Sequence, residues 1–524
     1  MNEIMISPIN GNATQSIVSA LTMIKENEET LIRFEKGSYR FLKDGTLEDY
    51  FYPSNNTSGR KNVVFPILNI KNLTIDGGGS EFVFCDRIFP FVIQNGENIT
   101  LKNFSIDFSF PRHCEAEVVS SDKRGFELTI DKKIFEYDVE NGHLNFHIGT
   151  YISSSAERRF FLNDLSGGAP VAYLVAGDTT DSLDNLPAPV MRTDAEETET
   201  GVYFKFRNGS PVINYCPGDI IFIGNDERRE NDIIFAEFSK NICFENIKMF
   251  RGAGMGIIAQ ICTDISVDRL EIAPKAGRDT LLSITADALH FVNCDGKITV
   301  KNSIIEKTID DAINIHGVYS LVDEILSENS VRLRFGHFSQ NGLIPFKAGD
   351  IAVVNDMQNG IEKGEARIET VSFDEDRTNI VLTFDTDISK LISAGDALEN
   401  PGRMSEFKFV NNRISDLPHM RISTCKDTLI SGNRILNATI VVDDLYDYWY
   451  ESGTVGNLEI SDNVFTENTG KLSIVIRSCR KGEQMKKHKN VTVINNSFNK
   501  PCQETVSIEA VENLTLENNR FAEK

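Results

Sequence analysis

A repeated pattern of asparagine and alternating apolar residues constrains the fold of this chain more than any other feature. A polar residue, usually Asn, is followed by two or three alternating apolar positions, a second Asn and a further apolar residue. Clear copies are NITLKNFSI at 98–106, NICFENIKM at 241–249, DISVDRLEI at 264–272, NLEISDNVF at 457–465, NVTVINNSF at 490–498 and NLTLENNRF at 513–521, and weaker copies begin at Asn72, Lys297, Glu406 and Asp427. In the continuous stretches the copies start about 21 to 33 residues apart, and their period-2 alternation indicates short strands.

This repeat predicts an all-β chain folded as a right-handed parallel β-helix. One coil cannot bury its apolar side chains alone, whereas stacked coils place them in shared interior columns. Asn suits the turns because it tolerates left-handed backbone angles and can hydrogen-bond to its counterpart in the next coil. Leucine-rich and helical repeats fit worse because they need helix-length segments between strands. The one convincing helical segment, 14–29, is expected to be a short N-terminal cap on the first coil.

Two stretches interrupt the repeat, and both are rich in short alternating strands. They share a similar Gly-Asp turn, CPGDIIFIGND at 216–226 and KAGDIAVVND at 347–356, and are expected to form small β-barrel-like modules. The predicted division is a cap with the first coils at 1–110, an insertion at 111–232, central coils at 233–318, a second insertion at 319–402 and C-terminal coils at 403–524.

Charge and cysteine content exclude several classes of function. The 54 Lys and Arg against 77 Asp and Glu give a net charge of −23, which repels nucleic acid and anionic membrane surfaces. The nine scattered cysteines include no C-x-x-C pair, so we predict reduced, mostly buried thiols and no metal or redox site. The sequence contains no run of 18 or more apolar residues, so we expect no membrane insertion. The first fifteen residues lack the pattern of a signal peptide.

Laying the coils over one another predicts which side chains are neighbours. The register comes from aligning Cys262, Cys294 and Cys425. It places Leu289 over Ile257 and Met420, as an interior column requires. The coils can therefore be compared position by position.

In this register the motif ADALHF at 286–291 matches DDAINI at 310–315 and stacks Asp287 beside Asp311. Adjacent parallel strands lie about 4.8 Å apart, so the two carboxylates should be close neighbours. Their repulsion should raise the pKa of one, which leaves an acid and a base together near neutral pH, as glycoside hydrolysis requires. Asp310 adds a third carboxylate, and a bend at a coil corner could turn both Asp310 and Asp311 toward the same groove.

Polar and aromatic residues near these aspartates are candidates for sugar binding. The same register places His290 beside Asn314 and Arg421, and the segment 443–453 concentrates aromatic rings that could stack on a sugar. The candidate substrate-binding set is His290, Asn314, His316, Arg421, Tyr448, Trp449 and Arg477. The alternatives are that the aspartates only solvate strand ends, that His290 is an ordinary surface or core histidine, and that the aromatic rings only pack onto the end of the helix.

The segment TADALHFVNCDGKITVKNSIIEKTIDDAINIHG at 285–317 resembles the signature region of glycoside hydrolase family 110, bacterial α-1,3-galactosidases acting on blood-group-B and linear α-1,3-galactosyl glycans. The N-terminal helix followed by IRFEKGSYRF, the insertions and the Asn-rich C-terminal coils agree with that family's layout. The resemblance implies an inverting hydrolase of carbohydrate that needs no metal or other cofactor. It also implies Asp287 as general acid, Asp311 or Asp310 as base, and a periplasmic or extracellular location.

Inversion sets a condition that the structure can test. It requires roughly 6.5–9.5 Å between acid and base, so the side chains of Asp287 and Asp311 on adjacent coils must splay apart. If they do not, Asp310 is the better base.

Two other functions stay open: a Ca²⁺-dependent polysaccharide lyase with Arg421 as base, and a non-catalytic glycan-binding β-helix. The insertions could also mediate a homodimer.

Overall fold

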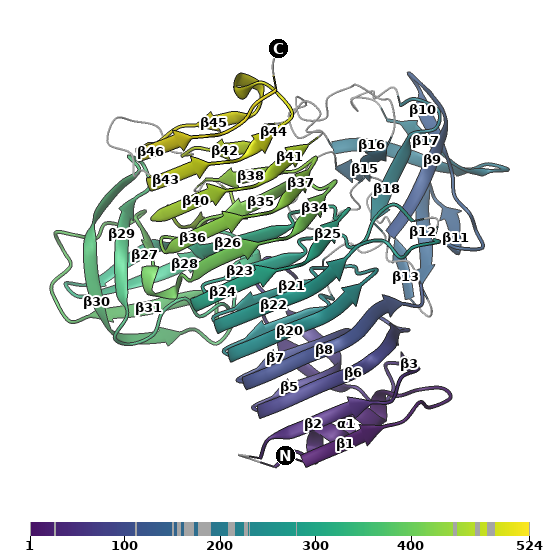
Figure 1. Ribbon diagram of the computed structural model, residues 1–524, viewed down its shortest axis with the longest axis horizontal. Coiled ribbons are helices and arrows are strands. Elements are labelled where there is room, and N and C mark those ends of the chain that lie inside the picture. Colours follow the sequence, from purple (N-terminus) through teal and green to yellow (C-terminus); the bar gives the residue numbers. More distant parts are fainter. Residues whose placement is uncertain are drawn as a thin grey trace.

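The computed structural model is a right-handed parallel β-helix, as the repeat predicts (Figure 1). One sheet holds eighteen strands and a second holds twelve, and strands from successive coils pair in parallel within each. The residues that the structure describes are 2–25, 28–110, 113–148, 151–154, 159–161, 172–176, 190–207, 215–224, 229, 231–278, 280–443, 448–466, 472–478 and 488–522.

The Asn-containing repeats form the eighteen-stranded sheet. Strand β20 (Lys240–Met249) lies between β8 (Glu97–Phe108) and β22 (Thr263–Ile272), and their apolar side chains face a common core. The turn asparagines adopt left-handed backbone angles, and the Asn98 side chain donates to Asn72 Oδ1 at 2.7 Å. This hydrogen bond between counterparts in adjacent coils repeats along the helix, which confirms the expected role of Asn.

The twelve-stranded sheet carries the predicted interior column. Strand β23 (Leu289–Val292) pairs with β21 (Ile257–Gln260) on one side and β26 (Ile313–Val318) on the other, and β26 pairs in turn with β35 (His419–Ile422). Leu289 therefore lies between Ile257 and Ile313, and Ile313 is paired with Met420. The register derived from the sequence is confirmed.

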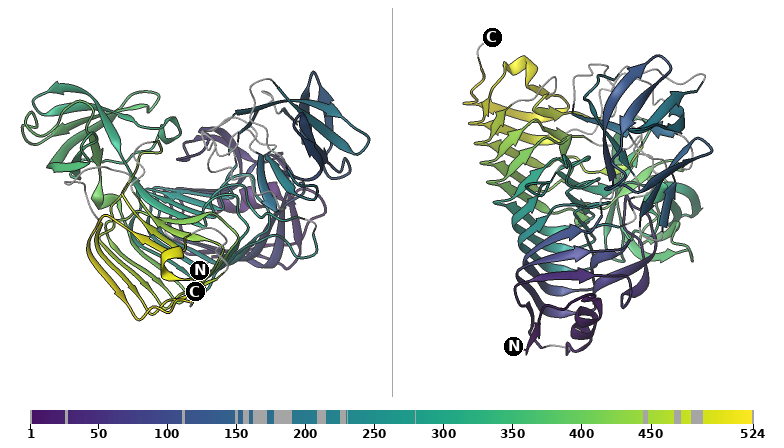
Figure 2. Two further views of the ribbon diagram at one scale, coloured as in Figure 1. Left: turned by 90° about the horizontal axis from the view of Figure 1, so that it is seen from above. Right: turned by 90° about the vertical axis from the view of Figure 1, so that its right-hand side faces the viewer.

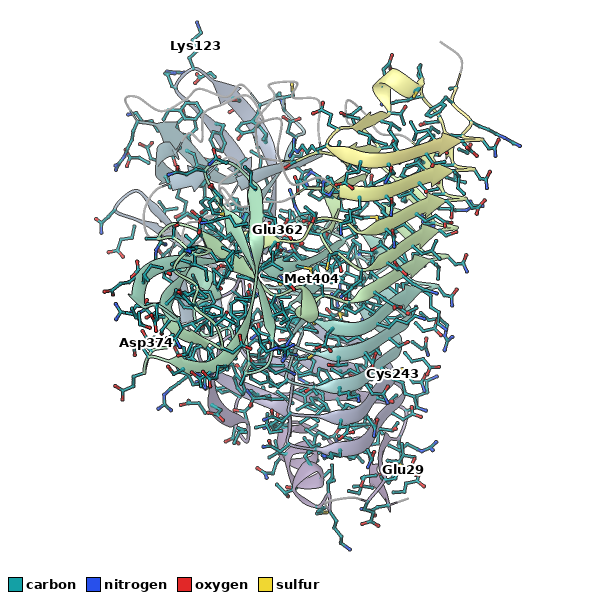
Figure 3. All side chains as sticks on the ribbon, turned by 90° about the vertical axis from the view of Figure 1, so that its left-hand side faces the viewer. Glu29, Lys123, Cys243, Glu362, Asp374 and Met404 are labelled. Carbon is teal, nitrogen blue, oxygen red and sulfur yellow. The ribbon has the colours of Figure 1, made fainter. Side chains whose placement is uncertain are left out.

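Each insertion lies in the chain between a strand of one large sheet and a strand of the other. The first, from β9 (His113–Asp122) to β18 (Ile220–Gly224), forms a seven-stranded and a three-stranded antiparallel sheet, and the described strands of both stay open, where a barrel-like module was expected. The second, from β27 (Ser320–Ser327) to β32 (Ala397–Glu399), forms a closed six-stranded barrel. Viewed from above, the two rise from the same side of the β-helix and diverge (Figure 2). Lys123 and Asp374 mark their outer edges in Figure 3.

Two further details of the fold differ from expectation. Helix α1 (Thr14–Thr22) is shorter than the predicted 14–29, because its buried side chains end at Leu21 and half of residues 22–29 are charged. None of the eight described cysteines forms a disulfide, but only three are buried, so the prediction of mostly buried thiols is wrong. Strand alternation turns Cys243 outward between two buried neighbours on β20 (Figure 3). No helix in the described segments is long and apolar enough to cross a membrane.

Candidate active site

Three aspartates meet where two adjacent coils enter the twelve-stranded sheet. Asp287 lies two residues before Leu289 and Asp311 two residues before Ile313, and these strand residues are paired. One carboxylate oxygen of each of Asp287, Asp310 and Asp311 lies within 4.8 Å of the others. Asp287 and Asp311 are each 3% exposed, whereas the Asp310 side chain is 14% exposed.

A bend before β26 brings Asp310 and Asp311 to the same side. Strict alternation would point consecutive side chains to opposite faces. Here the Thr308 hydroxyl donates to the Asp310 carbonyl at 2.6 Å, and the Asp311 backbone N–H donates to Asp310 Oδ1 at 3.1 Å. These short-range contacts hold the turn that the sequence left open.

Asp311 is held as an anion. Its two oxygens contact His419 Nδ1 at 3.1 Å and Arg421 Nε at 3.2 Å. Burial works to raise the pKa of Asp311, but the hydrogen bond with His419 and the charge of Arg421 outweigh it and hold that pKa below its ordinary value.

Asp310 titrates at a higher pH. Burial and the nearby Asp287 raise the pKa of Asp310 to about 6, against the opposing charge of Arg229, with which it forms an ion pair. Arg229 lies near the end of the first insertion. An ionised Asp310 is therefore available at neutral pH.

Asp287 holds its proton most strongly of the three. Burial first, and then the charge of Asp311, raise the pKa of Asp287 to about 8. Its Oδ2 lies 2.6 Å from His290 Nδ1. A protonated acid and ionised carboxylates thus coexist in one cluster near pH 7.

The three carboxylates are close enough together to hold a cation. However, Arg229 is paired with Asp310, and Arg421 and His419 contact Asp311. The two guanidinium groups already supply the positive charge that a bound Ca²⁺ would bring. The donor set therefore favours acid and base chemistry over a metal centre.

The histidines predicted to bind sugar are engaged inside the protein. His316 Nε2 lies 3.2 Å from His290 Nε2, and His316 Nδ1 lies 2.7 Å from the Gly317 carbonyl. With His290 Nδ1 against Asp287, neither ring keeps a free nitrogen for a sugar hydroxyl, so this prediction is corrected. Packing between coils, which the sequence does not reveal, pairs the two rings.

The other polar candidates join a buried network. Arg421 Nη1 contacts Asp443 Oδ1 at 2.8 Å, and the half-exposed Arg477 contacts Asp443 Oδ2 at 3.2 Å. Burial works to lower the pKa of Arg421, but the charges of Asp311 and Asp443 outweigh it and raise that pKa. A guanidinium stabilised in this way is a poor base, which weakens the lyase alternative. Asn314 donates to Glu451, and its Oδ1 accepts no hydrogen bond from any described residue.

The aromatic segment packs against the barrel. The Trp449 ring centroid lies 4.5 Å from that of His337, and the Tyr448 ring lies 5.0 Å from that of Trp449. Gln340 Nε2 donates to the Trp449 carbonyl at 2.6 Å. Tyr448 remains 41% exposed, so one ring stays accessible to a sugar. Residues 444–447, with a third aromatic candidate at 446, lie outside the described segments.

Several members of the site were not predicted. His419 directly precedes Met420, so the coil register could have placed it near Asp311. Glu451 had no comparable signal, because its strand β39 (Glu451–Ser452) runs antiparallel to β26 after the aromatic segment. The sequence also gave no signal for Arg229, which lies near the end of an insertion, or for Asp443, which follows an interior strand.

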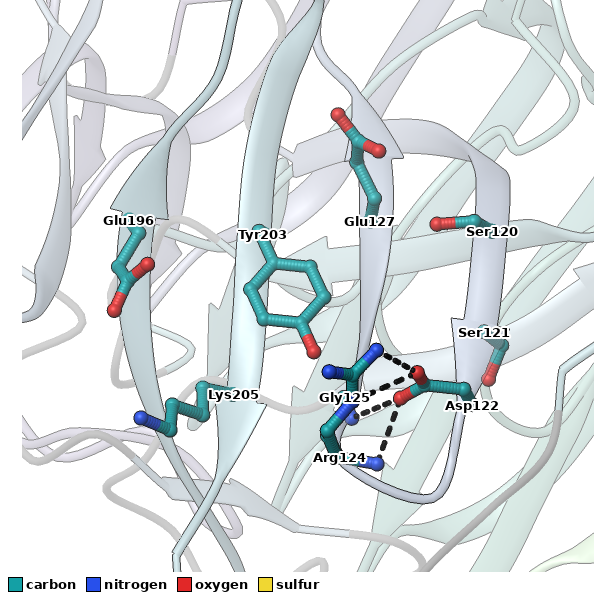
Figure 4. Close-up of a pocket in the computed structure, with 9 residues that line it drawn as sticks. All are labelled: Ser120, Ser121, Asp122, Arg124, Gly125, Glu127, Glu196, Tyr203 and Lys205. Atoms are coloured by element: carbon teal, nitrogen blue, oxygen red, sulfur yellow. Dashed lines mark hydrogen bonds and ion pairs between the residues drawn. The ribbon is translucent and has the colours of Figure 1, made fainter.

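A cavity of about 470 Å³ opens on the first insertion beside the turn between β9 and β10 (Gly125–Thr129) (Figure 4). Its arginine, Arg124, is paired with Asp122 at 2.7 Å. None of its lining residues belongs to the aspartate cluster. The cluster on the β-helix is therefore the stronger candidate for catalysis.

Comparison with known proteins finds relatives named α-1,3-galactosidase. No family model matches the chain. It is 29% identical to α-1,3-galactosidase A of Shewanella woodyi over 97% of this chain and 83% of that protein. It is 27% identical to α-1,3-galactosidase A of Bacteroides thetaiotaomicron over 98% of this chain and 90% of that protein. A surface adhesin of Streptococcus pneumoniae, PfbA, is similar at 11% identity and a TM-score of 0.34 over 97% of this chain and 86% of that chain. The resemblance to glycoside hydrolase family 110 is confirmed, and the chain is related to the α-1,3-galactosidases over most of its length.

Proposed function

We propose that this chain is an exo-acting glycoside hydrolase that removes terminal α-1,3-linked galactose from blood-group-B or linear Galα1-3Gal glycans. The observation that carries the proposal is the cluster of three carboxylates within 4.8 Å of one another, in which burial and mutual repulsion raise the pKa of Asp287 to about 8 and that of Asp310 to about 6. The names of its relatives support galactose as the substrate.

Asp287 acts as the general acid and Asp310 as the general base. Asp287 gives its proton to the glycosidic oxygen, the bond from that oxygen to the anomeric carbon breaks, and Asp310 removes a proton from the attacking water. Asp310 is the better base because its pKa is raised to about 6 whereas that of Asp311 is held below its ordinary value, and because its side chain is the more exposed of the two. Asp311 instead contributes a fixed negative charge that keeps Asp287 protonated.

The stereochemical outcome tests the mechanism. The carboxylates lie closer together than the roughly 6.5–9.5 Å typical of inverting enzymes. Inversion therefore requires that the galactosyl ring and water separate Asp287 from Asp310. We expect proton NMR to show β-galactose as the first product, and α-galactose as first product would replace inversion with a retaining mechanism.

Galactose release is the direct test of function. We expect release from a linear Galα1-3Gal disaccharide, a branched B antigen or both, unchanged by chelator, with the ratio of rates defining the preferred glycan. An ultraviolet-absorbing product from uronic-acid polymers that is lost with chelator would support the lyase alternative instead. Binding to either glycan without release would leave a glycan-binding protein.

The pH dependence of kcat/KM should be bell-shaped. Activity requires an ionised Asp310, so it falls as the pH drops below about 6, and a protonated Asp287, so it falls as the pH rises above about 8. Initial rates from pH 4.5 to 9.5 measure both limbs. A single limb would show that only one of the two groups titrates in the free enzyme.

Tyr448 offers a platform for the sugar next to galactose. Its exposed ring could stack on the apolar face of a pyranose. We expect Tyr448→Ala to raise KM about 5- to 10-fold with little change in kcat, from the loss of roughly 1 kcal/mol of stacking. The control is Tyr50→Ala, on a tyrosine of similar exposure at β4 (Leu47–Phe51). Equal KM values for the two variants would remove Tyr448 from the site.

A periplasmic or extracellular location and a homodimer stay predictions. Cell fractionation of the source organism tests the first. Light scattering of the purified chain tests the second, and a mass near 58.7 kDa would show a monomer.

A further inference from the structure

Asp287, His290 and His316 form a continuous line of contacts inside the protein. Asp287 Oδ2 lies 2.6 Å from His290 Nδ1, and His290 Nε2 lies 3.2 Å from His316 Nε2. The line ends where His316 Nδ1 lies 2.7 Å from the Gly317 carbonyl. Both rings are at most 2% exposed, so water does not compete for these atoms.

The position of each proton follows from the end of this line. A carbonyl only accepts, so His316 Nδ1 must carry a hydrogen. Burial lowers the pKa of both histidines to about 4, so both rings are neutral near pH 7. His316 Nε2 then carries no hydrogen, and its lone pair accepts a hydrogen bond from His290 Nε2–H. Because His290 is neutral, its Nδ1 carries no hydrogen and is an acceptor facing Asp287. The proton between Nδ1 and Oδ2 must belong to Asp287.

We propose that His316 is a positioning residue for the general acid: by fixing the tautomer of His290, it keeps the proton of the Asp287–His290 pair on Asp287. This inference rests on the proposed function for its catalytic meaning, but the tautomers exist with or without substrate. In the reaction the Asp287 O–H turns from His290 to the glycosidic oxygen. The proton passes to that oxygen, and the carboxylate that remains faces an imidazole with no Nδ1–H to stabilise it.

The charged groups that face this line come from four parts of the chain. Asp310 and Asp311 precede β26, Arg421 lies on β35, Glu451 lies on β39 and Arg229 ends the first insertion. Glu451 Oε1 lies 3.5 Å from His316 Nε2. All five are retained in the variants below, so a change in the titration of Asp287 reports the tautomer of His290.

The first test reads the protonation directly. The protein is labelled with ¹⁵N at histidine, and NMR identifies the protonated ring nitrogens at pH 7 without substrate. We expect His316 as the neutral Nδ1–H tautomer and His290 as the neutral Nε2–H tautomer. A His290 that is cationic or carries its hydrogen on Nδ1 would overturn the proposal, whatever the substrate of the enzyme.

The second test compares two substitutions at His316. In His316→Phe the Nε2–H of His290 loses its acceptor, the ring can donate from Nδ1 to the Asp287 carboxylate, and the alkaline limb of kcat/KM should move down by about one pH unit. His316→Gln keeps an acceptor oxygen and should retain the wild-type limb. The control His113→Gln removes a buried histidine that contacts Glu115 at 2.8 Å outside the site.

The outcomes separate this inference from the proposed function. An unchanged alkaline limb in His316→Phe, with thermal unfolding showing a folded protein, would overturn the positioning role. A limb lowered equally in His316→Gln and His316→Phe would also overturn it, because the acceptor would then be irrelevant. If wild type releases no galactose, the proposed function fails while the NMR result still decides the tautomers.

Discussion

Asp287→Asn is expected to lower kcat on a galactosyl disaccharide by about 10²–10⁴-fold, because the leaving sugar then departs without a proton. The same variant should retain most of its activity on p-nitrophenyl α-galactoside, whose leaving group needs little protonation. Asp310→Asn should lose activity on both substrates, since the attacking water is activated in either reaction. Galactose and nitrophenol release measure the two effects.

The control for both variants is Asp323→Asn, on an exposed aspartate of the barrel. It should match wild type on both substrates. If Asp310→Asn kept nitrophenyl activity while Asp287→Asn lost it, the assigned roles would be exchanged. If Asp311→Asn alone abolished both reactions in a folded protein, Asp311 rather than Asp310 would be the base.

Arg421→Met is expected to lower the free energy of unfolding by about 3–5 kcal/mol, because it leaves the buried Asp311 without its guanidinium partner and Asp443 with Arg477 alone. Arg421 contacts Asp311 at 3.2 Å and Asp443 at 2.8 Å, and both aspartates are almost fully buried. Urea unfolding followed by circular dichroism measures the change.

Two further variants test whether the loss of stability comes from the buried charges. Arg434→Met removes an exposed arginine from strand β37 (Arg434–Leu436) and should change stability by less than about 0.5 kcal/mol. Adding Asp311→Asn to Arg421→Met should recover part of the loss, because one uncompensated charge is removed. Equal losses for the Arg421 and Arg434 variants would show that the buried network adds nothing measurable.

The fold was readable because one physical requirement repeats in every coil. Each copy must place apolar side chains inside and a residue that tolerates positive φ at the turn, so the pattern at 241–249 predicts the strand that forms there. The same register correctly brought Asp287 beside Asp311. The end of α1 could not be predicted from the sequence, because it depends on where the surface of the first coil stops.

The surroundings of the aspartates were only partly predictable. Residues on paired strands, such as His290 and Asn314, follow from the register, but the direction of their polar atoms depends on neighbours outside the repeat. Glu451 reaches the site by an antiparallel return of the chain. Such contacts obey no period, so alignment of coils could not find them.

The interruption of the β-helix by the barrel imposes an order on the synthesis of the site. His419, which contacts Asp311, lies 108 residues further along the chain. At about 5–20 residues per second, a ribosome needs roughly 5–20 seconds to supply it. During that interval the last central strand, β26, pairs only with β23, and Asp311 lacks its contact with His419. The nascent chain therefore cannot complete this end of the β-helix until the entire barrel has been made.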